Sequence, residues 1–308
     1  MKTLLLLVLF SCLAACASVP KQTEDLFAAK TFPVHSKQVI EDVPFIKQSA
    51  GHCGPAALTM ALNFSGNKST VNEVAPQVYT PGMQGSLQTD MISASRRQGM
   101  MAIPITGLET LLKEIEAGNP VIVFENLSVS WFPQWHYAVV FGYDLEKQEV
   151  IMHSGPEESK RWDLRKFERS WMLGDYWGLV VLPPEKISTT ASEASHISAA
   201  AALEQIGKLD EAETAYYRIL KQWPKSLGAF IGLANIAYSE KEYAKAEMYL
   251  EQALKAHPEA AVAWHNLAFA QSASGDNKKA RASALEALKR VSPENRATYS
   301  ENLKAWTH

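Results

Sequence analysis

Apolar residues just after Cys53 recur at helical spacing. Positions 57, 58, 61 and 62 are apolar within a run of good helix formers, and Pro55 stands near the expected first turn. This spacing predicts a helix over about 54–64, so that Cys53 lies at a helix N-terminus. Two further helices are expected over about 87–98 and 109–117, each followed by a glycine.

Beyond Gly118 the apolar pattern shortens into runs typical of strands. Val, Ile, Phe and Tyr gather over 121–124, 137–141, 150–152 and 179–182, separated by turn residues. A helical half is thus followed by a sheet half. The order predicts an α+β domain over 41–183.

The last third of the chain repeats itself after a linker at 184–195. Alanines recur at 212, 246 and 280 and prolines at 224, 258 and 293, with Phe230 and Trp264 one repeat apart. The interval of 34 or 35 residues resembles the tetratricopeptide repeat, a helix-turn-helix unit. The resemblance implies an all-α solenoid of about three repeats over 196–308. Ala199 stands where the later units have Leu233 and Leu267, as expected of an atypical end unit.

The N-terminus has the pattern of an export signal. Lys2 precedes seven apolar residues, and the run ends in Leu-Ala-Ala-Cys at Cys16. This ending resembles the lipobox of bacterial lipoproteins, which implies a signal peptide at 1–15 and a diacylglycerol on Cys16. A secreted protein without lipid is the alternative. Ala17 in place of aspartate implies an anchor in the outer membrane facing the periplasm, with 16–40 as a tether.

Composition and charge limit the possible partners. The chain is 47% hydrophobic and 20% charged, which is ordinary for a folded protein. Its formal net charge of −3 offers no basic surplus for phosphate backbones, so a nucleic-acid partner is not expected. The histidines and cysteines show no ligand-spaced cluster, and no metal or other cofactor is expected.

Cys53 becomes the candidate nucleophile by elimination and by its position. Cys12 lies in the expected signal and Cys16 would carry lipid, which leaves Cys53 as the one thiol of the processed chain. A thiol attacks carbonyl groups as the thiolate, which a helix N-terminus stabilises. The backbone N–H of Cys53 and the side-chain amide of Gln48, five residues upstream, are candidate donors to an oxyanion.

Two segments carry a more specific resemblance. Gln48-Ser-Ala-Gly-His-Cys53-Gly-Pro-Ala resembles the nucleophile segment of cysteine peptidase family 39, a family of papain-like bacteriocin leader peptidases. Trp135-His136-Tyr137 and the apolar run ending at Gly142 resemble its histidine motif. The resemblance implies a papain-like α+β fold with Cys53 as nucleophile, His136 as general base and Gln48 in the oxyanion hole. Cleavage of double-glycine leaders is not carried over, because the chain shows neither a transporter nor a cytoplasmic address.

The third member of the family's site, an aspartate after the next strand, has no counterpart at the expected place. The corresponding stretch is Val-Ile-Met-His153-Ser154-Gly-Pro. His153, Ser154, a backbone carbonyl, or a distant acid such as Asp144 or Asp163 remain the candidates for orienting His136. Five tryptophans lie between 131 and 177, and most are expected to pack in the core. Trp135, next to His136, is the one expected to line a substrate groove.

These patterns favour an envelope lipoprotein that hydrolyses peptide bonds through a Cys-His pair. The repeats would recruit a substrate or protein partner through their concave face. A second hypothesis is a catalytically weak or inactive peptidase fold that binds peptides as a scaffold. A third is an acyltransferase, since a Cys-His pair also supports acyl transfer to an amine.

Overall fold

The computed structural model describes residues 19–48 and 51–304. The proposed signal peptide and Cys16 lie outside these ranges. The described residues form two compact units. Residues up to 91 and 104–180 belong to one, and 92–103 together with the residues after 180 belong to the other.

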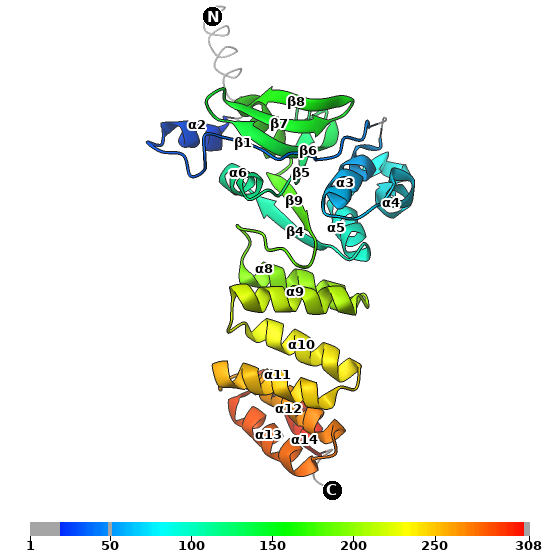
Figure 1. Cartoon of the computed structure of the whole chain (residues 1–308), viewed down its shortest axis with the longest axis vertical. Coiled ribbons are helices and arrows are strands. Elements are labelled where there is room, and N and C mark those ends of the chain that lie inside the picture. The colour runs from blue at the N-terminus through cyan, green and yellow to red at the C-terminus, as the bar shows by residue number, and fades with distance from the viewer. Residues whose placement is uncertain (1–18, 49–50, 305–308) are drawn as a thin grey trace, which may run out of the picture. The chain divides into compact units, whose positions relative to one another are not determined.

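A seven-stranded sheet forms most of the first unit (Figure 1), and its strands β4 and β9 cross the boundaries at 103 and 180. Six strands follow the order β4-β9-β5-β6-β7-β8, and β1 pairs with the far end of β6. The central pairs β5–β6, β6–β7 and β5–β9 are antiparallel. The strands are β1 (Lys37–Val39), β4 (Met101–Thr106), β5 (Val121–Asn126), β6 (Trp135–Asp144), β7 (Glu149–Ser154), β8 (Glu157–Asp163) and β9 (Trp177–Leu182).

Helices cover this sheet, and α3 (Cys53–Phe64) packs against β5 and β6. Nine of its twelve residues are buried, so the apolar run after Cys53 is part of the core. The other helices are α2 (Lys21–Ala28), α4 (Val71–Val78), α5 (Gln88–Arg97), α6 (Leu108–Glu116) and α7 (Leu164–Met172). A short hairpin of β2 (Tyr79–Thr80) and β3 (Gly85–Ser86) encloses the turn Pro81–Met83.

The all-helical region consists of three helix pairs and a terminal helix, as the repeat pattern predicts. The repeated alanines at 212, 246 and 280 are fully buried where helices meet. The prolines at 224, 258 and 293 follow the second helix of each pair. The helices are α8 (Glu193–Gln205), α9 (Leu209–Gln222), α10 (Leu227–Ser239), α11 (Tyr243–Ala256), α12 (Ala261–Ala273), α13 (Asn277–Arg290) and α14 (Arg296–Lys304).

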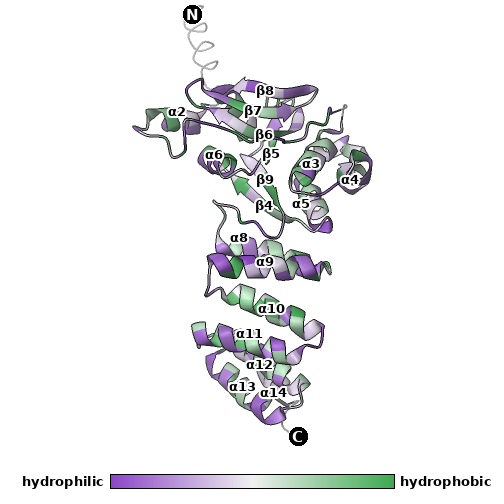
Figure 2. Ribbon diagram, in the orientation of Figure 1, coloured by the Kyte–Doolittle hydropathy of each residue, from purple (hydrophilic) through white to green (hydrophobic). Residues whose placement is uncertain are grey.

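Both edge strands of the sheet differ from the sequence interpretation. Strand β4 lies within the half expected to be helical, and Pro104 fits there because an edge strand can lack one N–H donor. Strand β8 carries almost only charged and polar residues, so no apolar run marks it (Figure 2). Charged edge strands resist pairing with other chains, which explains the missing signal. The expected order of a helical half and then a sheet half is therefore too simple.

Part of the segment interpreted as a tether is helical. The backbone N–H groups of Gln22 and Thr23, at the start of α2, donate to the buried carboxylate of Glu168 at 2.9 and 2.6 Å. Glu168 comes from α7, 145 residues further along the chain. A helix N-terminus held by so distant a partner leaves no local pattern in the sequence.

Candidate active site

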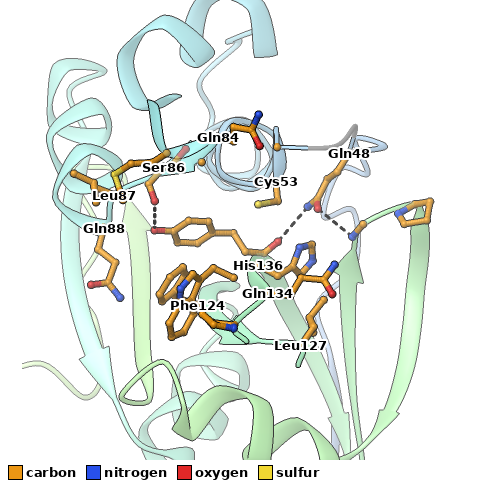
Figure 3. A pocket seen from close by; sticks show the side chains of 18 residues that line it. Gln48, Cys53, Gln84, Ser86, Leu87, Gln88, Phe124, Leu127, Gln134 and His136 are labelled. Atoms are coloured by element: carbon orange, nitrogen blue, oxygen red, sulfur yellow. Dashed lines mark hydrogen bonds between the residues drawn. The ribbon is translucent and has the colours of Figure 1, made fainter. Parts of the chain in front are cut away.

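Cys53 is the first residue of α3, as the sequence predicts to within one position. It lines a cavity of about 890 Å³ together with His136 and Gln48, and all three face it in Figure 3. The helix N-terminus places its partial positive charge at the sulfur. The structure therefore brings together the three residues that the sequence assigns to nucleophile, base and oxyanion donor.

Gly54 follows the nucleophile and lies against Ser86, which lines the cavity. A Cβ atom at this position would lie 2.3 Å from Ser86 Oγ and 2.6 Å from Ser86 Cβ. The Tyr137 hydroxyl in turn donates to the Ser86 carbonyl at 3.1 Å. The glycine of the Cys-Gly pair is thus required by the close approach of the strand β3 segment to α3.

Gln48 is fixed at both ends of its side-chain amide. Its Oε1 accepts a hydrogen bond from the Gly155 backbone at 3.0 Å, and its Nε2 donates to the Tyr137 carbonyl at 3.4 Å. The backbone N–H of Gln48 also donates to the Gly155 carbonyl. The bond from Nε2 is the long one, and an amide nitrogen carries two donors. This geometry leaves Nε2 suited to shift its donation to an oxyanion formed at Cys53.

Ser154 is the residue that contacts the candidate base. Its hydroxyl lies 3.1 Å from His136 Nε2. When Nε2 carries the ring proton it donates to Ser154, and the lone pair stays on Nδ1, the tautomer that a general base needs. Ser154 is neutral, so it orients the ring without adding negative charge beside it.

The other sequence candidates for orienting His136 are engaged elsewhere. The buried His153 ring places Nε2 3.1 Å from the Val43 carbonyl, and its Nδ1 accepts from the Ser159 backbone at 3.2 Å. Asp144 accepts from the Lys147 backbone, and Asp163 caps α7 by accepting from the Lys166 backbone. Both carboxylates therefore accept hydrogen bonds from nearby backbone groups, Asp144 in a turn and Asp163 at the start of α7.

The protonation state of the Cys-His pair follows from its burial. Burial raises the pKa of the Cys53 thiol, although backbone N–H groups of Tyr137, Gly54 and Cys53 oppose the rise. Burial, together with the positive charge of Lys160, lowers the pKa of His136 to about 4. Near neutral pH the pair is therefore a thiol beside an uncharged imidazole.

Aromatic side chains form the rim of the cavity. Trp135 is 48% exposed and stacks on Phe124, with ring centroids 4.9 Å apart, so that its outer face is open to a substrate. Trp131 is 78% exposed and Phe132 nearly as much, contrary to the expectation that most of these tryptophans pack in the core. Of the rest, Trp171 is fully buried, and 162 and 177 are half-buried. Trp131 and Phe132 lie in the loop between β5 and β6 and do not line this cavity, whereas Trp135 is the first residue of β6 and does.

Glu125 is a buried neighbour of the candidate base that sequence reasoning missed. It is fully buried in β5, and its Cα pairs with that of His136 across the β5–β6 ladder. Glutamate is rarely buried without a role, but only the strand register shows which residue it faces. An isolated acid at the end of the apolar run 121–124 was the one available signal.

Within the described ranges, no group of three or more His, Cys, Asp or Glu side chains is arranged to hold a metal ion. Across the same ranges, no helix is both long and apolar enough to cross a bilayer.

The fold and the site together define the class as a cysteine-peptidase-like α+β domain joined to helical repeats. Comparison with protein families makes this specific, since residues 40–176 match the Peptidase C39 like family. Residues 197–226 and 237–306 match tetratricopeptide repeat families. The protein therefore consists of a C39-like peptidase domain followed by tetratricopeptide repeats.

Solved structures resemble parts of the chain. A C39-like peptidase from Bacillus anthracis is 18% identical, with 50% of this chain and 99% of that chain covered and a TM-score of 0.41. The peptidase domain of the Streptococcus ABC transporter ComA is 22% identical, covering 48% and 99%, with a TM-score of 0.37. MamA from Desulfovibrio magneticus is 20% identical, covering 39% and 66%, with a TM-score of 0.34. A search of curated proteins found no match.

Proposed function

We propose that this protein is a cysteine peptidase that hydrolyses peptide bonds at Cys53. The observation that carries the proposal is the position of Cys53 at the start of α3, in one cavity with His136 and Gln48. The match of residues 40–176 to the C39-like family supports the same reaction class. The half-exposed Trp135 face offers an apolar surface for a substrate side chain.

The reaction would proceed by covalent catalysis. Nδ1 of His136 takes the Cys53 proton as the sulfur attacks the peptide carbonyl, and the oxyanion receives hydrogen bonds from the Cys53 backbone and Gln48 Nε2. Collapse of this intermediate breaks the C–N bond, and the imidazolium returns its proton to the leaving amine. A water molecule, deprotonated by His136, then hydrolyses the thioester and restores the thiol.

A second function, peptide binding without turnover, is favoured by the electrostatics of the free site. The raised pKa of Cys53 and the lowered pKa of His136 disfavour the thiolate-imidazolium pair on which papain-like catalysis depends. Under this alternative the cavity holds a peptide and the repeats assemble a complex. Acyl transfer to an amine is the third outcome and uses the same pair.

The three functions give different products. Full-length protein would be incubated with a peptide library, with and without an added amine, and new termini would be mapped by mass spectrometry. Cleavage that Cys53→Ala abolishes supports the peptidase, and amine adducts support the acyltransferase. Peptides retained equally by wild type and Cys53→Ser, with no new termini, would point to the scaffold and rule out the peptidase. Cys53→Ser preserves the size of the side chain and serves as the matched control.

We further propose that the protein is a lipoprotein of the cell envelope, anchored through Cys16 and facing the periplasm. The support is the sequence Leu-Ala-Ala-Cys after the N-terminal apolar run. Labelled palmitate should enter the wild-type protein and leave Cys16→Ser unlabelled, while both are exported. Equal labelling, or none in the wild type, would contradict the anchor.

The repeats are proposed to recruit a protein partner or substrate. A groove of about 320 Å³ in this region is lined by apolar side chains and by Asn235 and Asn266, whose amides lie 3.5 Å apart. Asparagine amides suit the backbone of an extended peptide, which offers a donor and an acceptor at each residue. If the groove recruits substrate, the double variant Asn235→Ala, Asn266→Ala should slow cleavage of protein substrates but not of short peptides.

A further inference from the structure

Glu125 is a buried acid beside the proposed catalytic base. The side chain is 0% exposed and follows four apolar residues of β5. Carboxyl groups are almost never buried to this extent unless they are paired or functional. The C39-like site, as interpreted from sequence, lacks an acid at the expected place, so the position of Glu125 bears on how the site works.

The register of the sheet places Glu125 and His136 on one face. The two residues are direct cross-strand partners in the antiparallel β5–β6 pair, and their neighbours Phe124 and Tyr137 are the next pair. Partners of this kind share a face, with Cβ atoms about 5 Å apart. Phe124 and Tyr137 accordingly contact each other, with ring centroids 4.8 Å apart, on the opposite face.

Only one oxygen of the Glu125 carboxyl is satisfied. Its Oε2 accepts a hydrogen bond from the Ser170 hydroxyl of α7 at 2.7 Å. Its Oε1 is buried and makes no hydrogen bond to any described residue. A buried oxygen without a donor favours a neighbouring positive charge.

The charged groups around Glu125 come from two strands. Strand β6 contributes His136, and β8 contributes Lys160, whose charge acts on both Glu125 and His136. Helix α7 contributes the neutral Ser170. Of the three cations of this helix, those at 166 and 169 are exposed, and the half-buried Arg165 donates to Gln148. Strand β9 pairs with β5 only as far as Val123, which lies opposite a glycine.

We propose that Glu125 is the acid of this site: it acts through space on His136, from the preceding strand, and stabilises the imidazolium that forms when Cys53 loses its proton. Glu125 is thus a positioning residue that works through the base, and Ser154 holds the ring in place. The inference rests on the proposed function, because it assigns the third member of that same Cys-His site.

The charge of Glu125 depends on pH in the range where the enzyme would work. Burial raises its pKa to about 7, against the opposing effects of the Ser170 hydrogen bond and Lys160. Below pH 7 the carboxyl is neutral and the thiol-imidazole pair stays uncharged. As pH rises through 7, an ionised Glu125 favours the imidazolium, so that the thiolate-imidazolium pair becomes more populated.

The pH profile of Cys53 alkylation tests this directly. Iodoacetamide would be added to the full-length protein between pH 5 and 8.5, and peptide mass spectrometry would follow Cys53 alone. Any thiol below its pKa reacts faster as pH rises, so the rate at Cys53 is taken relative to that of a small model thiol. This relative rate should rise about tenfold between pH 6 and 8 in the wild type, which corresponds to about one pKa unit of coupling. Glu125→Gln should lose this rise while keeping a wild-type circular dichroism spectrum.

A second variant keeps the test decisive if Glu125→Gln folds poorly. Ser170→Ala removes the hydrogen bond that lowers the Glu125 pKa, so the rise in rate should move to higher pH. A purely structural role for Glu125 would not move it. A rise that stays at the same pH in folded Glu125→Gln, or in Ser170→Ala, would overturn the assignment.

Alkylation needs no peptide substrate, which separates this inference from the proposed function. A protein with the Glu125-dependent rise but no cleavage of the peptide library would retain the assigned acid and lose the peptidase. Cleavage of the peptide library with no dependence on Glu125 would support the peptidase and contradict the assignment of Glu125 as its acid.

Discussion

Glu125 and His136 should change the stability of the fold with pH in opposite directions. The folded pKa of Glu125 is raised from 4.5 to about 7, so its stabilising protonation is complete below pH 4.5 and lost as pH rises through 7. The folded pKa of His136 is lowered from 6.5 to about 4, so its contribution is complete above pH 6.5 and lost as pH falls through 4. Each of these two protonation changes alters the free energy of unfolding by about 3 kcal/mol over its pH range.

Urea unfolding of single variants separates the two contributions. Relative to wild type, Glu125→Gln should gain about 3 kcal/mol between pH 4.5 and 7.5, because it no longer loses a buried proton. His136→Gln should gain a similar amount as pH falls from 6.5 to 4. The opposite signs make each variant the control for the other, and a flat difference for Glu125→Gln would contradict its raised pKa.

Ser154 lies where a charge would act most strongly on the base. Ser154→Asp should place a carboxylate within hydrogen-bond distance of His136 Nε2, raise the pKa of that histidine and increase Cys53 alkylation at pH 7 by tenfold or more. Ser154→Ala should lower the alkylation rate several-fold because the ring loses its partner. A Ser154→Asp variant no more reactive than Ser154→Ala would show that the ring does not respond to charge at this position.

At the scale of elements, the contact between α3 and the β3 segment forms one wall of the site. Gly54→Ala should push this segment away, because the new methyl group would overlap the Ser86 side chain. Overpacking of this kind typically costs about 1–3 kcal/mol. A lower melting temperature together with slower alkylation of Cys53 is expected.

The double variant Gly54→Ala, Ser86→Gly is the matched control. Ser86→Gly removes the Cβ and Oγ atoms that the methyl group would meet at 2.6 and 2.3 Å, so the pair should recover most of the lost stability. Strictly additive losses in the two single variants and the double variant would show that the overlap is not the cause.

The elements that sequence could predict are those with a local pattern. The helix at Cys53, the central strands and the repeat helices each carry apolar spacing or turn residues of their own. Strands β4 and β8 lie at sheet edges, where proline and charge replace the apolar run. Helix α2 is capped by Glu168 from a distant helix, a contact that has no local signature.

The residues of the candidate site also differ in whether a local sequence pattern marks them. Cys53, Gln48 and His136 lie in two contiguous segments of sequence, and each segment resembles a motif of a known peptidase family. The Glu125 pairing depends on strand register, which a single sequence does not determine. The contact between Ser154 and His136 was one of several open choices, because two adjacent residues on β7 point to opposite faces.

At the scale of the whole molecule, the described residues form two compact units, and the repeat helices belong to the second. The stability of a repeat array is approximately the sum of contributions from each repeat and from each contact between neighbouring repeats. A change at one interface therefore alters the free energy of unfolding of the array. One close contact of this kind joins α9 and α10. A Cβ at Gly232 would lie 2.1 Å from the Tyr216 ring, which is buried and donates to Glu204.

Gly232→Ala should therefore destabilise the repeat region strongly, although alanine is the better helix former. Gly228→Ala on the same helix is the control, since its nearest neighbours are flexible Ile197 atoms at 3.0–3.1 Å. Thermal unfolding followed at 222 nm should show a melting temperature several degrees lower for Gly232→Ala than for Gly228→Ala. Below that transition Cys53 should be alkylated at the wild-type rate, because the thiol and its partners lie in the other unit. Slower alkylation in folded Gly232→Ala would instead show that the repeats influence the cysteine site.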